Sequence, residues 1–206
     1  MSADVRTDDG GRGRWNHNVH YHRVVLDAVP AGARTALDVG CGEGTLARRL
    51  RERVPEVTGV DLHGPSLAAA RAAGGDVAWV EGDVLTHPFA PASFDVVASV
   101  ATLHHQDARA GLLRLAELVR PGGRLAVVGL ARVSSPLDLP YEAAGLLMSP
   151  VARRRRGYWE HPSPTVWPPP ATYAEMRALV RELLPGARYR RHVYWRWSAV
   201  WTRPPA

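Results

Sequence analysis

The 206-residue chain contains no lysine and no isoleucine, and all 26 of its basic residues are arginine. AT-poor codon usage produces both absences, so we expect a bacterial source of high GC content. The single cysteine, Cys41, excludes a disulfide within the chain and is compatible with a reducing compartment. No apolar run approaches the ~18 residues that a membrane span needs. The composition therefore predicts a cytoplasmic protein with no membrane partner.

The length of the chain suits one domain with a substantial core. Residues 1–14 are polar, glycine-rich and of mixed charge, which predicts a disordered tail before a single domain over 15–206. The net charge of +6 is compatible with a nucleic-acid partner. However, the arginines are spread along the chain and only Arg153–Arg156 forms a run, which favours a solvated face. The sequence does not predict an oligomeric state.

The most informative segment is residues 35–46, TALDVGCGEGTL. A short apolar run predicts a buried strand, and three alternate glycines then lead into helical periodicity. Such glycines allow positive φ and let a ligand approach the backbone, although a tight structural turn has the same pattern. The dinucleotide fingerprint places its third small residue where Thr45 stands. A dehydrogenase therefore fits less well than a protein that binds a zwitterion, with Asp38 facing its amino group.

The rest of the chain alternates strand and helix patterns. The expected strands after residues 36–39 are 57–60, 78–80, 94–100 and 124–129, and the expected helices include 18–29, 46–54, 65–73 and 112–119. This alternation predicts a parallel sheet with right-handed crossovers. A capping box at Thr172–Glu175 begins a further helix, and residues 189–202 have the composition of one or two closing strands.

Two acids and a valine stand where ligands bind such a sheet, beyond the carboxyl ends of the strands. Asp61 follows the second strand and can accept both hydroxyls of a ribose, although capping of the helix over 65–73 is an alternative role. Asp83 follows the third strand, and Val100 ends the fourth.

The segment DVGCGEG resembles the first motif of class I S-adenosylmethionine (SAM)-dependent methyltransferases. The likeness extends over residues 35–130, includes LVRPGG at 118–123, and continues more loosely to the C-terminus. It is closest to the small ubiquinone/menaquinone-type enzymes. The resemblance implies a Rossmann-like, doubly wound, mostly parallel seven-stranded sheet with an antiparallel closing strand, in three α/β/α layers.

SAM is the cofactor that the resemblance implies. It places the ribose on Asp61, the adenine beside Leu62 and the exocyclic amine on Asp83, with the Val84 backbone N–H at a ring nitrogen. The full set of expected cofactor-binding residues is Asp38, Gly40, Cys41, Gly42, Asp61, Leu62, Asp83, Val84 and Val100.

Methyl transfer from a sulfonium can rest on alignment and on the exclusion of water. A base is needed only when the acceptor must lose a proton, and histidine is the default base at neutral pH. The catalytic candidates are His105, in a Leu-His-His segment after the fourth strand, and His20, near the first helix. Structural hydrogen bonding is the alternative role for both.

Several other methyltransferase classes lack support. The Asn/Asp-Pro-Pro-aromatic motif of amine-methylating enzymes is replaced by Val100–Leu103, and Cys41 lies in the cofactor loop instead of at a cysteine-nucleophile position. No clustered carboxylates indicate a metal. We therefore predict in-line methyl transfer to a small organic acceptor, giving S-adenosylhomocysteine. RNA methylation through the basic surface and a SAM-binding cyclase or binding protein without transfer are the alternatives.

Residues 131–170 carry many prolines, the arginine run and little periodicity, which predicts a lid or substrate-binding insertion. Aromatic side chains suit a flat or greasy acceptor. We expect 134–170 and 15–22 to close over the site from opposite sides. The expected acceptor-binding residues are Trp15, Tyr21, His104, Trp159 and Trp167, whereas the strand tryptophans Trp195 and Trp201 are expected to cover the sheet.

Overall fold

The computed structural model describes residues 15–160 and 166–205, so the tail expected over 1–14 and part of the expected lid lie outside the described residues. One seven-stranded sheet runs through the molecule in the order β3-β2-β1-β4-β5-β7-β6. Its strands are β1 (Thr35–Val39), β2 (Glu56–Asp61), β3 (Ala78–Glu81), β4 (Phe94–Val100), β5 (Val119–Leu130), β6 (Arg188–His192) and β7 (Arg196–Thr202). Strands β1 to β5 are parallel, and β7 is antiparallel to both of its neighbours. The predicted Rossmann-like topology is confirmed.

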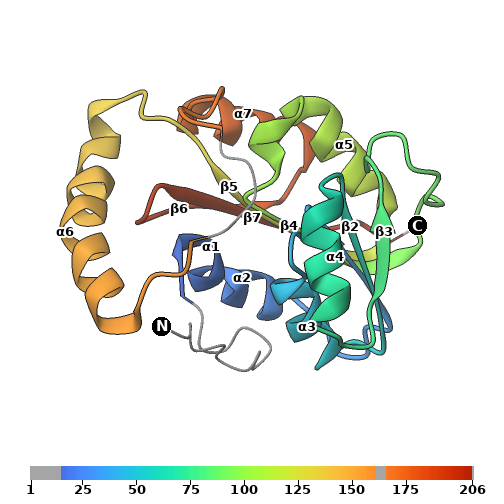
Figure 1. The fold of residues 1–206 in the computed structure, drawn as a ribbon. Helices are drawn as coiled ribbons and strands as arrows, with labels where there is room; N and C mark the ends of the chain where they lie inside the picture. The colour runs from blue at the N-terminus through green and yellow to red at the C-terminus, as the bar shows by residue number, and fades with distance from the viewer. Residues whose placement is uncertain (1–14, 161–165, 206) are drawn as a thin grey trace, which may run out of the picture.

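Helices cover both faces of the sheet, which completes the three layers (Figure 1). On one face lie α1 (His17–His20), α2 (His22–Leu26) and α3 (Thr45–Arg51), and on the other lie α5 (Ala108–Leu118) and α7 (Tyr173–Leu183). The helix α4 (Gly64–Ala72) packs beside β2 and β3. Each face has its own apolar cluster, because the near-continuous apolar strands present side chains to both.

Two predicted boundaries are wrong. The helix expected over 18–29 is two short helices separated at Tyr21, and the second ends at Leu26. The Asn16 side chain caps the first of them by accepting the N–H groups of Asn18 and Val19. Strand β5 begins at Val119 instead of Arg124, with a register shift against β4. The break at Tyr21 changes which side chains of this segment face the site.

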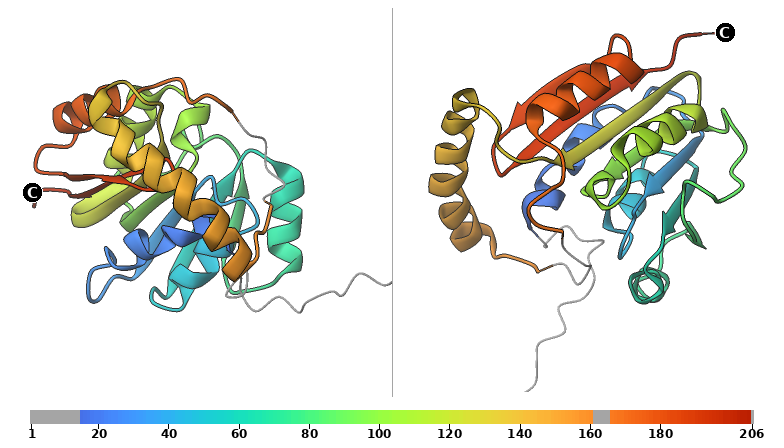
Figure 2. Two further views of the ribbon diagram at one scale, coloured as in Figure 1. Left: turned by 90° about the vertical axis from the view of Figure 1, so that its left-hand side faces the viewer. Right: turned by 90° about the horizontal axis from the view of Figure 1, so that it is seen from above.

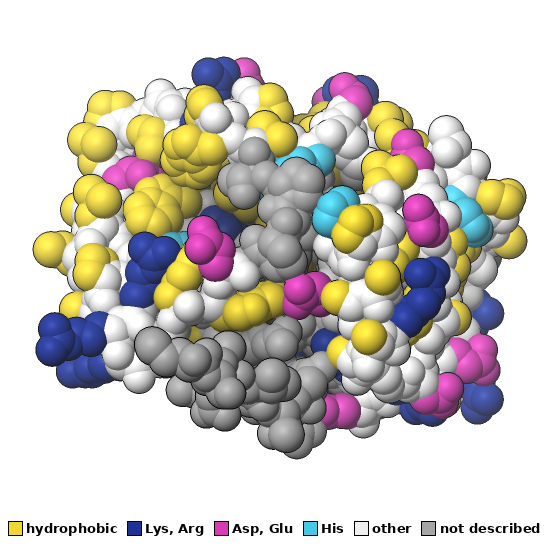
Figure 3. All heavy atoms as spheres, in the orientation of Figure 1, with side chains coloured by type: hydrophobic (Ala, Val, Ile, Leu, Met, Phe, Trp, Pro, Cys, Tyr) yellow, Lys and Arg dark blue, Asp and Glu magenta, His cyan; other side chains and the backbone are white. Residues whose placement is uncertain are grey.

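The predicted insertion contains an 18-residue helix, α6 (Leu139–Arg156), which the sequence pattern does not show. Its buried positions are small, Gly145 and Ser149, whereas Leu146, Leu147 and Val151 are exposed. Figure 2 shows α6 outside the three layers, beyond the end of the sheet where β5 ends and β7 begins. In Figure 3, apolar side chains gather over this helix and arginines at its far end. Because apolar side chains lie on the exposed side of α6, its sequence lacks the usual amphipathic pattern of a surface helix.

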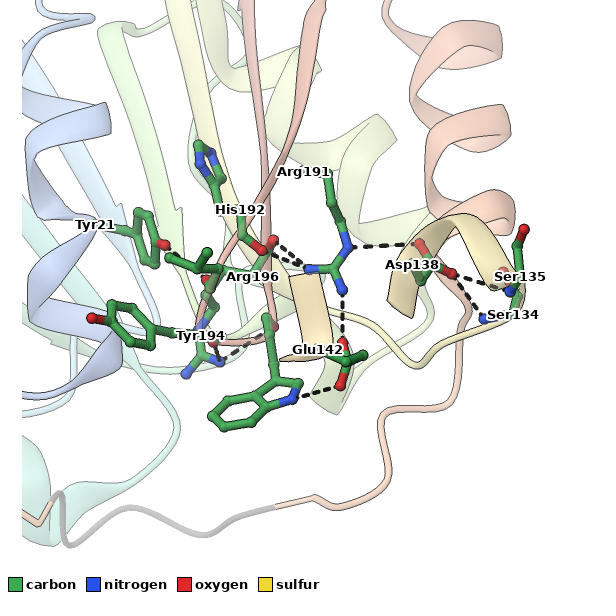
Figure 4. A network of polar contacts seen from close by, with 11 residues as sticks. Tyr21, Ser134, Ser135, Asp138, Glu142, Arg191, His192, Tyr194 and Arg196 are labelled. Atoms are coloured by element: carbon green, nitrogen blue, oxygen red, sulfur yellow. Dashed lines mark hydrogen bonds and ion pairs between the residues drawn. The ribbon is translucent and has the colours of Figure 1, made fainter. Parts of the chain in front are cut away.

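One arginine of β6 fastens the start of α6 to the closing hairpin (Figure 4). Arg191 Nη2 donates to Glu142 Oε1 at 2.9 Å, and its Nε lies 3.8 Å from Asp138 Oδ1. Trp195 Nε1 donates to the other Glu142 oxygen at 2.7 Å. The Arg191 guanidinium also lies 3.3 Å from the centroid of the Tyr173 ring. The helix is therefore held to the sheet by a half-buried polar network.

Arg191→Met should loosen α6 without altering the sheet, because Glu142 loses its charged partner. We expect a loss of about 1.5–3 kcal/mol in the free energy of unfolding, the range for a hydrogen bond to a charged group. Trypsin should also cut faster at the exposed run Arg153–Arg156. The control is Arg190→Met, which removes an exposed arginine of the same strand. Equal cleavage rates in the two variants would show that Arg191 does not anchor the helix.

Candidate functional site

The glycine loop after β1 has the geometry that the sequence predicts. Gly40, Gly42 and Gly44 have φ of 70°, 53° and 73°. A Cβ on Gly40 would lie 2.0 Å from Thr102 Oγ1, so this position has no room for a side chain. Gly40 N donates to Val60 O at 2.8 Å, which ties the loop to the end of β2. The loop therefore packs closely against its neighbours, and only glycine fits at this position.

A cavity of about 470 Å³ opens beyond the carboxyl ends of β1, β2, β4 and β5. The expected cofactor-binding residues that line it are Gly40, Asp61, Leu62, Asp83, Val84 and Val100. The other side of the cavity is formed by residues from outside these strands, including Asn16, His17, Asn18, His104, His105, Tyr158, Glu160 and Arg196. The structure thus brings the predicted SAM-binding residues together with a second, different set of side chains.

The acids of the cofactor side are held by backbone N–H groups. Asp61 Oδ2 accepts from Gly42 N at 2.7 Å, and Asp61 Oδ1 accepts from His63 N at 2.8 Å. Each carboxylate oxygen can accept a second hydrogen bond, which leaves capacity for two ribose hydroxyls. Asp83 Oδ1 similarly accepts from Leu85 N at 2.9 Å. Asp61 therefore holds the glycine loop and also lines the cavity with hydrogen-bonding capacity to spare.

A second cavity of about 40 Å³ adjoins the first and shares four lining residues with it, Asn16, Asn18, Gly40 and Val100. It is lined by Asp38 and Cys41. Asp38 is 2% exposed, and its Oδ2 has no partner among the described residues. Its pKa is raised to about 7, mainly because the carboxyl is buried and secondly because Asp61 lies nearby. Burial also raises the pKa of the Cys41 thiol, which keeps it unreactive. The unpaired Asp38 oxygen and the bare Gly40 both fit the amino-acid end of SAM.

The two histidines after β4 face the main cavity with neutral rings. Their ring centroids are 4.1 Å apart. Burial, then His105 and Arg196, lowers the pKa of His104 to about 4. Burial also lowers the pKa of His105, with Asp61 opposing it. Both are neutral at pH 7, so neither adds a positive charge beside a sulfonium.

The other catalytic candidate, His20, lines neither cavity. Its ring packs against Trp15, Tyr21 and Tyr194. His17, three residues earlier, lines the main cavity instead and pairs with Ser149 Oγ at 3.0 Å. The structure therefore does not place His20 where a catalytic base would stand.

Of the expected acceptor-binding residues, His104 alone lines the main cavity. Trp15 and Tyr21 are buried behind its wall, where the Tyr21 hydroxyl donates to Val193 O at 2.7 Å. Trp159 borders the smaller cavity, beside Asp38. Trp167 is 64% exposed and borders neither.

Sequence reasoning missed Asn16, His17, Asn18, Tyr158 and Arg196. The sequence contains an indication for two of them. Asn16 stands just before the first turn of a helix, and Arg196 interrupts an aromatic strand. Among residues 15–160 and 166–205, no group of three or more His, Cys, Asp or Glu could hold a metal ion. In the same part of the chain, no helix has the length and apolarity needed to cross a membrane.

Asp61→Asn should weaken SAM binding, because two ribose hydroxyls lose a charged acceptor while the side-chain shape is kept. We expect a loss on the order of 1.5–3 kcal/mol, or roughly 10- to 100-fold in Kd. Calorimetry with SAM measures it, and Asp76→Asn, at an exposed acid, is the control. Unchanged affinity in a folded variant would rule out the ribose assignment.

Asp38 makes SAM binding depend on pH. With a pKa of about 7, its carboxyl gains charge as the pH rises, so SAM affinity should increase up to about pH 7.5, above which the ligand's amino group starts to deprotonate. Asp38→Asn should bind SAM more weakly at pH 7.5 and lose the pH dependence. Calorimetry at several pH values checks this, and a pH-independent wild type would contradict it.

The same group affects stability with a definite sign. Because its folded pKa is raised, Asp38 favours folding below its unfolded pKa of about 3.9, and this contribution is lost as the pH rises through about 7. Without SAM, Asp38→Asn should therefore melt at a higher temperature than the wild type at pH 8, and the gap should shrink towards pH 4. A gap of the opposite sign at pH 8 would show that Asp38 is already paired.

Comparisons with known proteins agree with this geometry. A methyltransferase-domain family model matches residues 37–127. An uncharacterized methyltransferase of Mycobacterium tuberculosis is 44% identical over 193 residues, which cover 92% of this chain and 98% of the relative. The demethylmenaquinone methyltransferase of Beutenbergia cavernae is 36% identical over 126 residues, 60% of this chain and 51% of that protein. Among solved structures, SAM-bound CalS10, an amino pentose methyltransferase of Micromonospora echinaspora, has a TM-score of 0.64 at 18% identity, covering 98% of this chain and 99% of that one. The chain belongs to the SAM-dependent methyltransferases, and SAM is its cofactor.

Proposed function

We propose that the protein transfers the methyl group of SAM to a small organic acceptor by in-line displacement, in the cytoplasm, and releases S-adenosylhomocysteine. The observation that carries this proposal is the single cavity of about 470 Å³ that the cofactor-side acids and the second set of side chains share. Cavities of a few hundred Å³ suit small ligands. Since SAM must fill part of this volume, the remainder suits a small acceptor.

The residues of the chain act mainly by holding and positioning. Bound SAM supplies an electrophilic methyl group. Asp61 and Asp83 hold the adenosine end, and Asp38 holds the amino group, which fixes the direction of the methyl. Tyr158 lines the main cavity and not the smaller one beside Asp38, so we assign it to the acceptor. Orientation of this kind accounts for large rate effects without covalent help from the protein.

His105 is the group that takes a proton when the acceptor has to lose one. It lines the cavity, and burial lowers its pKa, so the ring is neutral at pH 7 and able to accept. His104 beside it also lines the cavity, which makes its ring a second candidate polar contact for the acceptor.

The two segments proposed as a lid contact each other. Trp159 N donates to Trp15 O at 2.9 Å, and the rings of Trp15 and Tyr158 are 6.3 Å apart. Both segments line the main cavity together with Val100 and Leu130, at the ends of β4 and β5. They therefore meet on one side of the site instead of closing from opposite sides. This contact supports a lid that excludes water from the reacting atoms.

The arginine run packs against the same aromatic residues, which favours a small acceptor over RNA. The Arg153 guanidinium lies 3.7 Å from the Tyr158 ring centroid, and that of Arg156 lies 5.9 Å from the Trp15 ring. Such cation–π contacts give these two arginines a role in the lid. An RNA track would instead need arginines ordered along an open groove.

The decisive experiment is a screen of small acceptors with SAM carrying a labelled methyl group. Labelled product together with S-adenosylhomocysteine is the expected result. A structured RNA pool, incubated in parallel, tests the alternative. SAM binding with neither labelled product nor S-adenosylhomocysteine across a broad panel would favour a protein that uses SAM without methyl transfer.

Tyr158→Ala should raise the acceptor's KM at least several-fold, because the acceptor side of the cavity loses an aromatic wall. The affinity for SAM should stay within about twofold, since the cofactor side is untouched. Trp167→Ala is the matched control, because it removes an aromatic side chain of the same segment that borders neither cavity. Kinetics that change in Trp167→Ala and not in Tyr158→Ala would contradict the assignment.

A further inference from the structure

The main cavity contains a buried arginine that has no carboxylate partner. Arg196 is the first residue of β7 and lies opposite Leu130, at the end of β5. It is 7% exposed and lines the cavity. Because β7 is antiparallel, its first residue reaches the carboxyl ends of the parallel strands, where ligands bind. The course of β7 therefore places the Arg196 cation in the wall of the cavity.

Neutral groups hold the Arg196 guanidinium in place. Its Nε donates to Asn18 Oδ1 at 3.2 Å, and one Nη2 hydrogen goes to the same oxygen. Its Nη1 donates to Tyr194 O at 3.0 Å and Trp195 O at 3.3 Å, as Figure 4 shows. A guanidinium has five N–H donors, so one Nη2 hydrogen keeps no acceptor among the described residues.

No carboxylate between residues 15 and 160 or 166 and 205 forms an ion pair with Arg196. Burial lowers its pKa to about 10, and the ionisable neighbours that oppose this effect are Tyr173, Tyr21 and Tyr158. The group is still a cation at neutral pH. A buried cation is costly unless an anion compensates it, and the part of the chain that the structure describes supplies no such anion to Arg196.

Charge divides the cavity into two ends. Asp61 ends β2 and Arg196 begins β7, and the strands β1, β4 and β5 lie between these two in the sheet. Asp61 belongs to the cofactor side, and SAM brings a positive sulfonium to the space between. An acceptor that reaches Arg196 therefore lies across the cavity from the adenosine-binding acids.

We propose that the methyl acceptor carries a carboxylate group and that Arg196 binds this group. The proposal rests on the proposed function and narrows its substrate class. Arg196 and His104 both line the cavity, so the remaining Nη2 hydrogen and the N–H of the neutral His104 ring are the two donors that we assign to the acceptor. Two donors match the two oxygens of a carboxylate, whereas a phosphate presents more oxygens and charge than this wall can satisfy.

The first test is anion binding to the protein saturated with S-adenosylhomocysteine. Acetate is titrated at constant ionic strength against chloride, with inorganic phosphate as the parallel arm. Tryptophan fluorescence reports binding, because Trp195 and Trp197 flank Arg196 in the chain. We expect saturable binding of acetate and weaker binding of phosphate. Arg196→Met should raise the acetate Kd at least tenfold. Arg196→Lys keeps the positive charge but loses the planar guanidinium, so it should raise the acetate Kd less.

The control is Arg188→Met, which removes an exposed arginine of the neighbouring strand and should leave acetate binding unchanged. SAM affinity within about threefold of the wild type shows that each variant is folded. If Arg196→Met does not fold, the acetate Kd of Arg196→Lys is compared with that of the wild type instead. No saturable acetate effect in the wild type, tighter phosphate than acetate binding, or equal binding in the folded Arg196 variants would overturn the proposal.

The second test compares acids with their amides as acceptors of the labelled methyl group. The wild type should act on the acid with a kcat/KM at least 100-fold higher, and Arg196→Met should reduce that ratio. Transfer to neutral acceptors alone would leave the proposed function standing and reject the carboxylate. Acetate binding without transfer to any acceptor would support the anion site and reject the proposed function.

Discussion

The hydrogen bond from Gly42 N to the Asp61 carboxylate fixes the geometry on which the whole site depends. It joins the loop after β1 to the end of β2, and Gly40 N and Cys41 N donate to Val60 O beside it. The loop can approach β2 so closely only because glycines occupy the positive-φ positions. A side chain that would bind the ribose therefore also shapes the cradle for the methionine end. Loss of its charge disturbs both parts together.

Two buried charges of opposite sign oppose the folding of the empty protein. Asp38 has an oxygen without a partner in the smaller cavity, and Arg196 has no carboxylate partner in the larger one. Burial of a charge is unfavourable until a counter-charge arrives. Such groups are typical of sites that are preorganised for a ligand. In our proposals the ammonium of SAM is the counter-charge for the first, and a carboxylate of the acceptor is the counter-charge for the second.

Much of the cofactor side follows from local sequence, and much of the acceptor side does not. Near-continuous apolar strands and the acids that end them locate β1 to β4 within a residue or so, because burial on both faces imposes that composition. The roles of His20 and His17 could not be separated, since the break at Tyr21 depends on tertiary packing. The sequence pattern did not predict the helix α6, because the buried positions of this helix are glycine and serine. Arg196 stood in the middle of an aromatic strand, and only the antiparallel course of β7 shows where it points.

The family match does not cover the residues of the proposed acceptor side. The methyltransferase-domain match ends at residue 127, and it contains the ends of β1 to β4, which carry the expected cofactor-binding residues. His17, Tyr158 and Arg196 lie outside it and come from three separate parts of the chain. They meet because α6 is fastened at its start by Arg191 and because Trp159, just beyond its end, bonds to Trp15. The proposed acceptor side is thus built by contacts among segments outside the matched region, so its chemistry has to be determined from these side chains and not from the family.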